Sequence, residues 1–224
     1  MKRFVRLFAV IITTLHLGLA TLSTNVFAND VKPNLNAGVP TVKILAYGDS
    51  LTAGYRLPPA DSYPKQLEVL LNNAKASKVE ITNGGVSGDT SAQALARLEW
   101  SLKKGPFDYA LLCVGANDGL RQLAVPELEA NLRKMLKTLK ERKVKVILLG
   151  MQLPTNFAPA YRKAFGATYP KLAKEFGVPL YPFLLEGITQ NPKLNLSDTI
   201  HPNKEGYALI AQKLESFLAP ILKR

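Results

Sequence analysis

A chain of 224 residues, 47% of them hydrophobic, is long enough to bury the core of a single domain. Its net charge of +12 at pH 7 fits either simple solubility or affinity for anionic partners, such as transient contact with an anionic membrane surface. The lysines are spread without a dense run, so no nucleic-acid partner is predicted. The single cysteine, Cys113, excludes an intramolecular disulfide and a thiolate metal cluster, and its apolar neighbours predict a buried thiol.

Residues 1–28 have the pattern of a signal peptide. Basic residues without acidic ones precede an apolar run over residues 7–22, and small side chains mark a cleavage site after Ala28. A transmembrane anchor is the alternative, but the run is short for a span and is interrupted by polar residues. We therefore expect a periplasmic or secreted protein. Cleavage removes His16, which leaves His201 as the one histidine of the mature chain.

Residues 29–40 are predicted to be a flexible lead-in, and residues 41–224 are predicted to form one domain. Along this domain, short apolar or β-branched runs alternate with helical patterns. Such alternation predicts a parallel sheet with helices on both faces, which is a doubly wound, three-layer α/β/α sandwich. The five runs expected to be strands are Val42–Tyr47, Val79–Thr82, Tyr109–Val114, Val144–Gly150 and Val178–Tyr181.

The helical patterns between these runs carry start signals. Thr90 and Asn203 are predicted N-caps, and Pro126 is expected to open a helix. In each pattern the apolar residues fall on one face, as expected for helices that cover a sheet. The expected helices lie around Leu67–Ala74, from Thr90 to Leu102, from Pro126 to Leu139, from Tyr161 to Phe176 and from Asn203 to Ile221.

Four polar segments follow strands or close the chain, at the edge where doubly wound sheets bind ligands. Taken singly, Ser50 fits a helix cap, Gly88 a turn or phosphate loop, and Asn117 a turn. His201 alone fits a surface loop, but Asp198 stands three residues earlier and can hydrogen-bond the imidazole. The nucleophile elbow G-x-S-x-G is absent. The segments read Gly-Asp-Ser-Leu-Thr (48–52), Val-Ser-Gly-Asp-Thr (86–90), Gly-Ala-Asn-Asp (115–118) and Asp-Thr-Ile-His-Pro-Asn (198–203).

Together, these segments resemble the four blocks of the SGNH hydrolase family, also called GDSL esterases/lipases, in order and approximate spacing. The resemblance implies the flavodoxin-like fold of that family, with a mainly five-stranded parallel sheet. It implies Ser50 as nucleophile, His201 as its base and Asp198 as the residue that orients the base. It also implies an oxyanion hole made by the backbone N–H groups of Ser50 and Gly88 and the side-chain amide of Asn117. No metal or organic cofactor is expected.

Within the family, residues 48–56, 87–91 and 169–176 are similar to the bacterial periplasmic group of acyl-CoA thioesterases, lysophospholipases and arylesterases. This similarity implies a small-molecule or lipid acyl ester or thioester as substrate, and we expect a monomer. The third block often reads Gly-Gly-Asn-Asp in the family, and Ala116 replaces the second Gly, which puts the loop conformation and acyl access in doubt. Two alternatives stay open: a carbohydrate O-deacetylase of envelope polysaccharide, and a non-catalytic periplasmic binding module.

The segments that flank the expected catalytic residues suggest substrate contacts. Tyr55 and Arg56 come just after the nucleophile block and are candidates to touch substrate. The loop over residues 151–160 follows the fourth expected strand and is either an apolar wall or lid of the acyl site or a plain connection. Its candidate substrate contacts are Leu153, Pro154 and Phe157.

Overall fold

The computed structural model describes residues 41–73 and 78–222. The predicted signal peptide (1–28), the alternative membrane anchor over residues 7–22 and the predicted lead-in (29–40) lie outside the described residues. Within the described ranges, no helix has both the length and the apolar character needed to cross a membrane.

Five parallel strands form one sheet in the order β2-β1-β3-β4-β5. This topology confirms the predicted doubly wound parallel sheet. The last strand is shorter than the predicted run, because only two of its residues pair with β4. The strands are β1 (Thr41–Gly48), β2 (Lys78–Gly85), β3 (Tyr109–Cys113), β4 (Lys145–Leu149) and β5 (Leu180–Tyr181).

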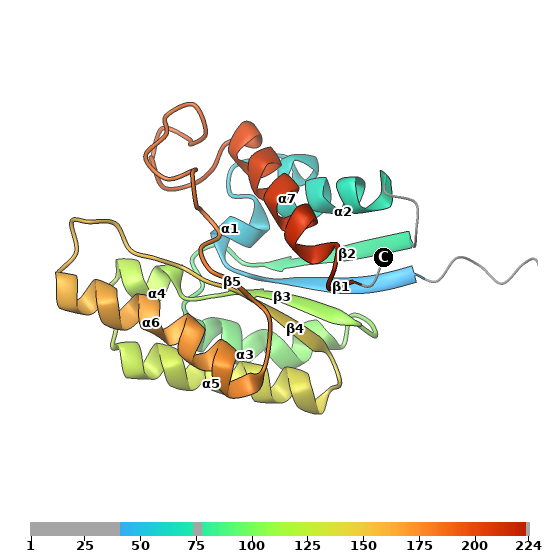
Figure 1. Ribbon diagram of the computed structural model, residues 1–224, viewed down its shortest axis with the longest axis horizontal. Coiled ribbons are helices and arrows are strands. Elements are labelled where there is room, and N and C mark those ends of the chain that lie inside the picture. The colour runs from blue at the N-terminus through green and yellow to red at the C-terminus, as the bar shows by residue number, and fades with distance from the viewer. Residues whose placement is uncertain (1–40, 74–77, 223–224) are drawn as a thin grey trace, which may run out of the picture. The chain divides into compact units, whose positions relative to one another are not determined.

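Helices cover both faces of this sheet (Figure 1). α2 and α7 pack together on one face, and α3, α5 and α6 lie side by side on the other. The predicted α/β/α layers are therefore present. The long helices are α2 (Tyr63–Asn73), α3 (Ser91–Leu102), α5 (Val125–Glu141), α6 (Pro159–Phe176) and α7 (Lys204–Leu218).

The predicted start signals act as expected in the long helices. Thr90 is the N-cap of α3, where its side chain and that of Gln93 form a reciprocal capping box. Pro126 lies in the first turn of α5, and the Asn203 side chain caps α7 by accepting a hydrogen bond from Gly206 N at 2.9 Å. The short elements were not predicted, because they span less than two turns and show no periodicity. They are α1 (Ser50–Ala53), the 3-10 helix η1 (Pro59–Asp61) and α4 (Ala116–Leu120).

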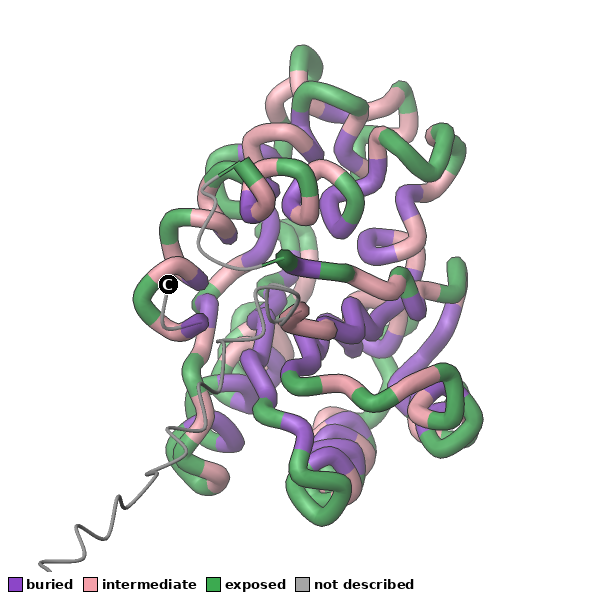
Figure 2. Tube along the Cα trace, turned by 90° about the vertical axis from the view of Figure 1, so that its right-hand side faces the viewer, coloured by how far each residue is buried: buried purple, intermediate pink, exposed green. Residues whose placement is uncertain are grey.

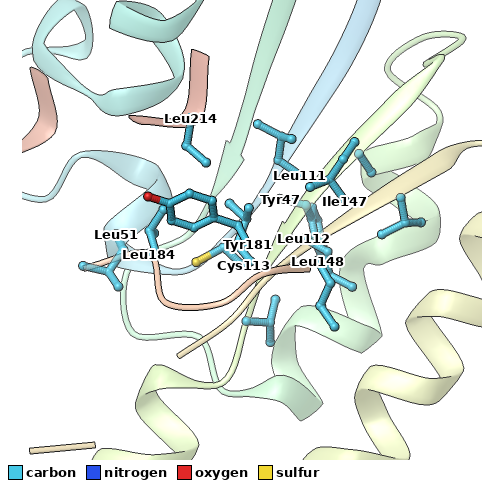
Figure 3. Packing of buried hydrophobic residues seen from close by; sticks show 14 of the residues in the cluster. Tyr47, Leu51, Leu111, Leu112, Cys113, Ile147, Leu148, Tyr181, Leu184 and Leu214 are labelled. Atoms are coloured by element: carbon cyan, nitrogen blue, oxygen red, sulfur yellow. The ribbon is translucent and has the colours of Figure 1, made fainter. Parts of the chain in front are cut away.

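The strands form the centre of the hydrophobic core. All five residues of β3 and four of the five in β4 are buried, and buried residues, purple in Figure 2, run through the strands. Figure 3 shows Cys113 among the buried side chains of this core. Burial raises the pKa of the Cys113 thiol well above its usual value, which suits a core residue rather than a nucleophile.

The direction of the winding reverses between β1 and β3. From β1 the chain first crosses to β2 on one side, and then returns past β1 to place β3 on its other side. In doubly wound sheets a crevice opens at the carboxyl ends of the strands at such a reversal. Ser50 comes two residues after the end of β1 and Asn117 follows β3, so both lie at this crevice.

Candidate active site

Ser50 lies on a tight turn between β1 and α1. The turn depends on Gly48, because a Cβ atom there would lie 2.2 Å from Thr52 Oγ1 and 2.4 Å from the carbonyl oxygen of Cys113. The close approach lets α1 begin immediately after the strand. Asp49 caps α1 by accepting a hydrogen bond from Leu51 N at 3.0 Å. Ser50, the first residue of α1, therefore stands at the edge of the sheet and faces a cavity.

The structure brings Ser50, His201 and Asp198 together in a hydrogen-bonded chain. Ser50 Oγ lies 2.9 Å from His201 Nε2, and His201 Nδ1 lies 2.9 Å from Asp198 Oδ2. The second carboxylate oxygen, Oδ1, accepts hydrogen bonds from the backbone N–H groups of Ile200 at 3.0 Å and His201 at 2.9 Å. These contacts fix the imidazole between a hydroxyl and a carboxylate, as in a nucleophile–base–orienter arrangement.

The environment of Asp198 keeps its carboxylate ionised. Partial burial acts to raise the pKa, but hydrogen bonds from the His201 N–H, the His201 ring and the Ile200 N–H outweigh it. The net result lowers the pKa of Asp198 to about 2. A carboxylate that stays charged holds the Nδ1–H tautomer of His201, which leaves Nε2 free to accept the Ser50 proton.

The loop that carries His201 is held by its own backbone. Leu196 N donates to the carbonyl oxygen of His201 at 2.8 Å, and Thr199 takes a left-handed conformation with φ of 61°. On the other side, the Tyr55 ring lies 4.4 Å from the His201 ring, centroid to centroid. Tyr55 thus packs against the imidazole rather than lining the cavity, and Arg56 stacks over Tyr55 at 5.0 Å.

The residues expected to form an oxyanion hole come from three separate segments of the chain. Asn117 lines the same cavity as Ser50, and its Nδ2 donates to the carbonyl oxygen of Asp89 at 3.0 Å. Gly88 has φ of +88°, which glycine adopts without strain. Among the described residues, the backbone N–H groups of Ser50 and Gly88 have no acceptor in the hydrogen bonds of turns and loops. Gly88 does not line the cavity but directly precedes Asp89, the partner of Asn117.

Ala116, which stands where the family often has a second glycine, does not have a positive φ. The positive φ of this loop, 121°, lies one residue earlier, at Gly115. A Cβ atom at Gly115 would lie 2.5 Å from Tyr169 Oη, so this first glycine is required. Ala116 is instead the first residue of α4 and lines the cavity. Its methyl group therefore narrows the cavity without straining the backbone.

A cavity of about 480 Å³ opens beside Ser50 and His201, within the about 300–1,000 Å³ usual for small-molecule sites. Leu153 and Pro154 line it, as the prediction of an apolar wall over residues 151–160 requires. Phe157 does not line it, because its half-buried ring packs against the hydrophobic core. Among residues 41–73 and 78–222, no three His, Cys, Asp or Glu side chains gather as metal ligands.

Much of the apolar lining of the cavity was not predicted from the sequence. Leu120 comes from α4, Phe183 and Leu185 follow β5, and Ile200 belongs to the loop between Asp198 and His201. One signal was available, since apolar residues directly after a parallel strand reach the ligand-binding edge of the sheet. The sequence does not show which of them turn inward, because that depends on loop conformation.

Asp49, the residue before Ser50, has a buried carboxyl group with a raised pKa. It is 1% exposed, and among the described residues its Oδ2 atom has no hydrogen-bond partner. Burial raises the pKa of Asp49 to about 7, against the hydrogen bond from Leu51 N that lowers it. The carboxyl group next to Ser50 is therefore mainly neutral below pH 7, unlike that of Asp198.

A parallel sheet that carries a hydrogen-bonded Ser, His and Asp at its winding reversal has the geometry of a serine hydrolase. The sequence matches the GDSL-like Lipase/Acylhydrolase family over residues 46–209, and the chain belongs to this family. This membership confirms the resemblance noted from the four sequence blocks, and with it the assignment of the chain as a hydrolase.

Known proteins agree with this assignment along most of the chain. Thioesterase 1/protease 1/lysophospholipase L1 of Escherichia coli strain K12 is 40% identical over 179 residues, which cover 80% of this chain and 84% of the relative. An arylesterase of Vibrio mimicus is 37% identical over 171 residues, which cover 76% and 84%. A crystal structure of TesA is similar with a TM-score of 0.76 and 32% identity, over 80% of this chain and 98% of that chain.

Proposed function

We propose that this protein is a serine esterase and thioesterase that hydrolyses acyl esters through an acyl-enzyme, with Ser50, His201 and Asp198 as its catalytic triad. The observation that carries the proposal is the distance of 2.9 Å between Ser50 Oγ and His201 Nε2, at the mouth of an apolar cavity. A nucleophile within hydrogen-bond reach of an oriented base is the signature of nucleophilic catalysis.

In the acylation step, His201 Nε2 takes the proton of the Ser50 hydroxyl while Oγ forms a bond to the carbonyl carbon. The carbonyl π electrons move to its oxygen, and a tetrahedral oxyanion results. When the oxyanion collapses, the bond to the leaving group breaks and His201 gives its proton to the departing oxygen or sulfur. Asp198 stays ionised throughout and stabilises the imidazolium.

In the deacylation step, water replaces the Ser50 hydroxyl. His201 takes a proton from the water, whose oxygen attacks the acyl carbon, and the bond from the acyl carbon to Ser50 Oγ then breaks. His201 returns its proton to Oγ, and the carboxylic acid leaves. The donors that we propose for both oxyanions are the N–H groups of Ser50 and Gly88 and the amide of Asn117. Removing one such donor costs about 2.7–4 kcal/mol of transition-state stabilisation.

The acyl chain is proposed to lie in the cavity of about 480 Å³. Its lining of leucine, methionine and phenylalanine side chains favours a chain of several methylene groups over an acetyl group, because each buried methylene contributes about 0.8 kcal/mol. The relatives are named for thioesters, lysophospholipids and aryl esters. These differ in the leaving group but share the acyl carbonyl, so we propose that all three classes are substrates.

The test compares hydrolysis of p-nitrophenyl octanoate and p-nitrophenyl butyrate by the wild type and its Ser50→Ala variant. Loss of a triad nucleophile lowers turnover by about 10⁶-fold, so the variant should be near background. Octanoate should give the higher kcat/KM.

Other outcomes would point to other functions. A preference for acetyl esters would favour an O-deacetylase of envelope polysaccharide. Equal, slow rates for wild type and variant, together with no labelling of Ser50 by a fluorophosphonate, would favour a binding module without turnover.

A further inference from the structure

The guanidinium of Arg97, on α3, joins the ends of two strands and the loop that carries Gly88. Its Nη2 donates to the carbonyl oxygen of Gly48 at 2.8 Å, and its Nη1 donates to that of Gly84 at 2.8 Å. Its Nε donates to Asp89 Oδ2 at 2.5 Å. The guanidinium carbon also lies 4.4 Å from the centre of the buried Tyr47 ring. The Arg97 side chain is only 19% exposed, so these contacts are largely shielded from water.

The partners of Arg97 are neighbours of all three proposed oxyanion donors. Gly48 ends β1, two residues before Ser50. Asp89 follows Gly88 and, through its backbone carbonyl, accepts the hydrogen bond that orients the Asn117 amide. One planar cation thus holds the backbone on both sides of the site, and a planar guanidinium fits this task because its donors have a fixed geometry.

We propose that Arg97 is a positioning residue that aligns the three donors of the oxyanion hole. This inference rests on the proposed function. Oxyanion donors act only at about 2.7–3.1 Å from the developing charge, so a small shift of the loops weakens all of them together. Arg97 touches neither the cavity nor the triad, and it acts through Gly48 and Asp89.

The inference predicts a specific kinetic defect. Arg97→Lys keeps the positive charge opposite Asp89 but cannot make three hydrogen bonds in one plane. With p-nitrophenyl octanoate, kcat should fall by about 10–100-fold, which does not exceed the fall in kcat caused by removing one oxyanion donor. KM should change by less than about threefold. Affinity for an alkylboronic acid, which forms a tetrahedral anion on serine, should fall by the same factor as kcat/KM.

A double variant separates positioning from plain loss of stability. If Arg97 acts through the donors, Asn117→Ala should cost less in the Arg97→Lys background than in the wild type, because the amide is already misaligned. Arg133→Gln is the control, since Arg133 bonds Glu129 and Glu175 on the outer helices, and its kcat should equal that of the wild type. Active-site titration with a fluorophosphonate corrects every rate for the folded fraction.

Two results would overturn the inference. One is an Arg97→Lys protein with wild-type kcat and boronic-acid affinity. The other is a fall in rate that titration explains entirely by fewer active molecules, with additive losses in the double variant. In both cases, inactivation by Ser50→Ala would leave the proposed function intact. Activity that survives Ser50→Ala would instead overturn the proposed function itself.

Discussion

At the scale of single residues, two aspartates near Ser50 show how environment sets charge. Asp198 accepts hydrogen bonds from two backbone N–H groups and an imidazole, and its pKa is lowered to about 2. Asp49 is buried with one carboxylate oxygen unpartnered, and burial raises its pKa to about 7. Hydrogen bonds therefore outweigh desolvation at Asp198, and desolvation outweighs them at Asp49. Only Asp198 is charged at every pH where the protein is expected to work.

Replacing Asp49 by asparagine should change how stability depends on pH. In the unfolded chain Asp49 ionises near pH 3.9, whereas in the folded chain it holds its proton until about pH 7. The folded wild type therefore loses stability as pH rises between these values, by roughly 1 kcal/mol per pH unit, and the loss levels off above pH 7. The amide of Asp49→Asn does not titrate in this range, so the free energy of unfolding of the variant does not fall for this reason.

Urea unfolding of both proteins at about pH 4.5, 6 and 8 checks this sign. The free energy of unfolding of Asp49→Asn, minus that of the wild type, should increase with pH up to about 7. The value at the lowest pH serves as the reference, because there the folded carboxyl is neutral like the amide and most of the loss of stability still lies at higher pH. A difference that stays constant across the series would contradict a raised pKa at Asp49.

At the scale of elements, helix α3 links fold and site. It begins at Ser91, three residues after Gly88, its cap is the reciprocal pair of Thr90 and Gln93, and its middle carries Arg97. The helix covers the sheet through Ala94 and Leu98, which are buried. The same element thus packs the core with one set of side chains and holds the loops of the site with another.

Loss of the α3 cap should weaken the fold by a modest amount. In Thr90→Ala, the Gln93 N–H at the helix start loses its side-chain acceptor, and such N-cap substitutions lower the free energy of unfolding by about 1 kcal/mol. Thr90→Ser keeps the hydroxyl and is the matched control, with a smaller loss. Urea denaturation measures both. Equal losses for the two variants would mean that the methyl group of Thr90, and not its cap, contributes the stability.

The helices and strands could be predicted where the periodicity of apolar residues agreed with the capping and turn residues at the ends of each segment. All five strands, the long helices and the caps Thr90 and Asn203 were predicted, because buried runs and capping residues are local signals. Ser50, His201 and Asp198 could be named from their sequence blocks, and the structure brings them into contact. The rest depends on how loops turn. Phe157 was expected beside the substrate but packs against the hydrophobic core, whereas Phe183 lines the cavity and was not predicted to do so.

At the scale of the whole molecule, the charge is unbalanced. The chain has 29 Lys and Arg against 17 Asp and Glu, and many of the acids already pair with cations, as Glu129 does with Arg133 and Lys171. The excess positive charge is therefore available to anionic surfaces in water. An enzyme acting on lysophospholipids would meet such surfaces where its substrate is found.

The protein should bind anionic lipid vesicles reversibly. Vesicles containing phosphatidylglycerol should retain it at about 50 mM salt and release it at about 500 mM, because the Debye length shrinks several-fold over that range. Vesicles of phosphatidylcholine alone are the control and should retain little at either salt concentration. Sedimentation measures the bound fraction. Binding that is independent of lipid charge would assign the excess positive charge to solubility alone.

The pairing of Ser50 with His201 spans 151 residues of sequence, and helix α7, which follows His201, packs against α2, which follows Ser50. The ribosome therefore makes the proposed nucleophile long before its proposed base. At about 5–20 residues per second, roughly 8–30 s pass between the two. During that interval the nascent chain carries Ser50 without His201, its proposed base. A chain that stops before His201 lacks the proposed base, so on the proposed mechanism ester hydrolysis begins only after synthesis has passed the last block of the site.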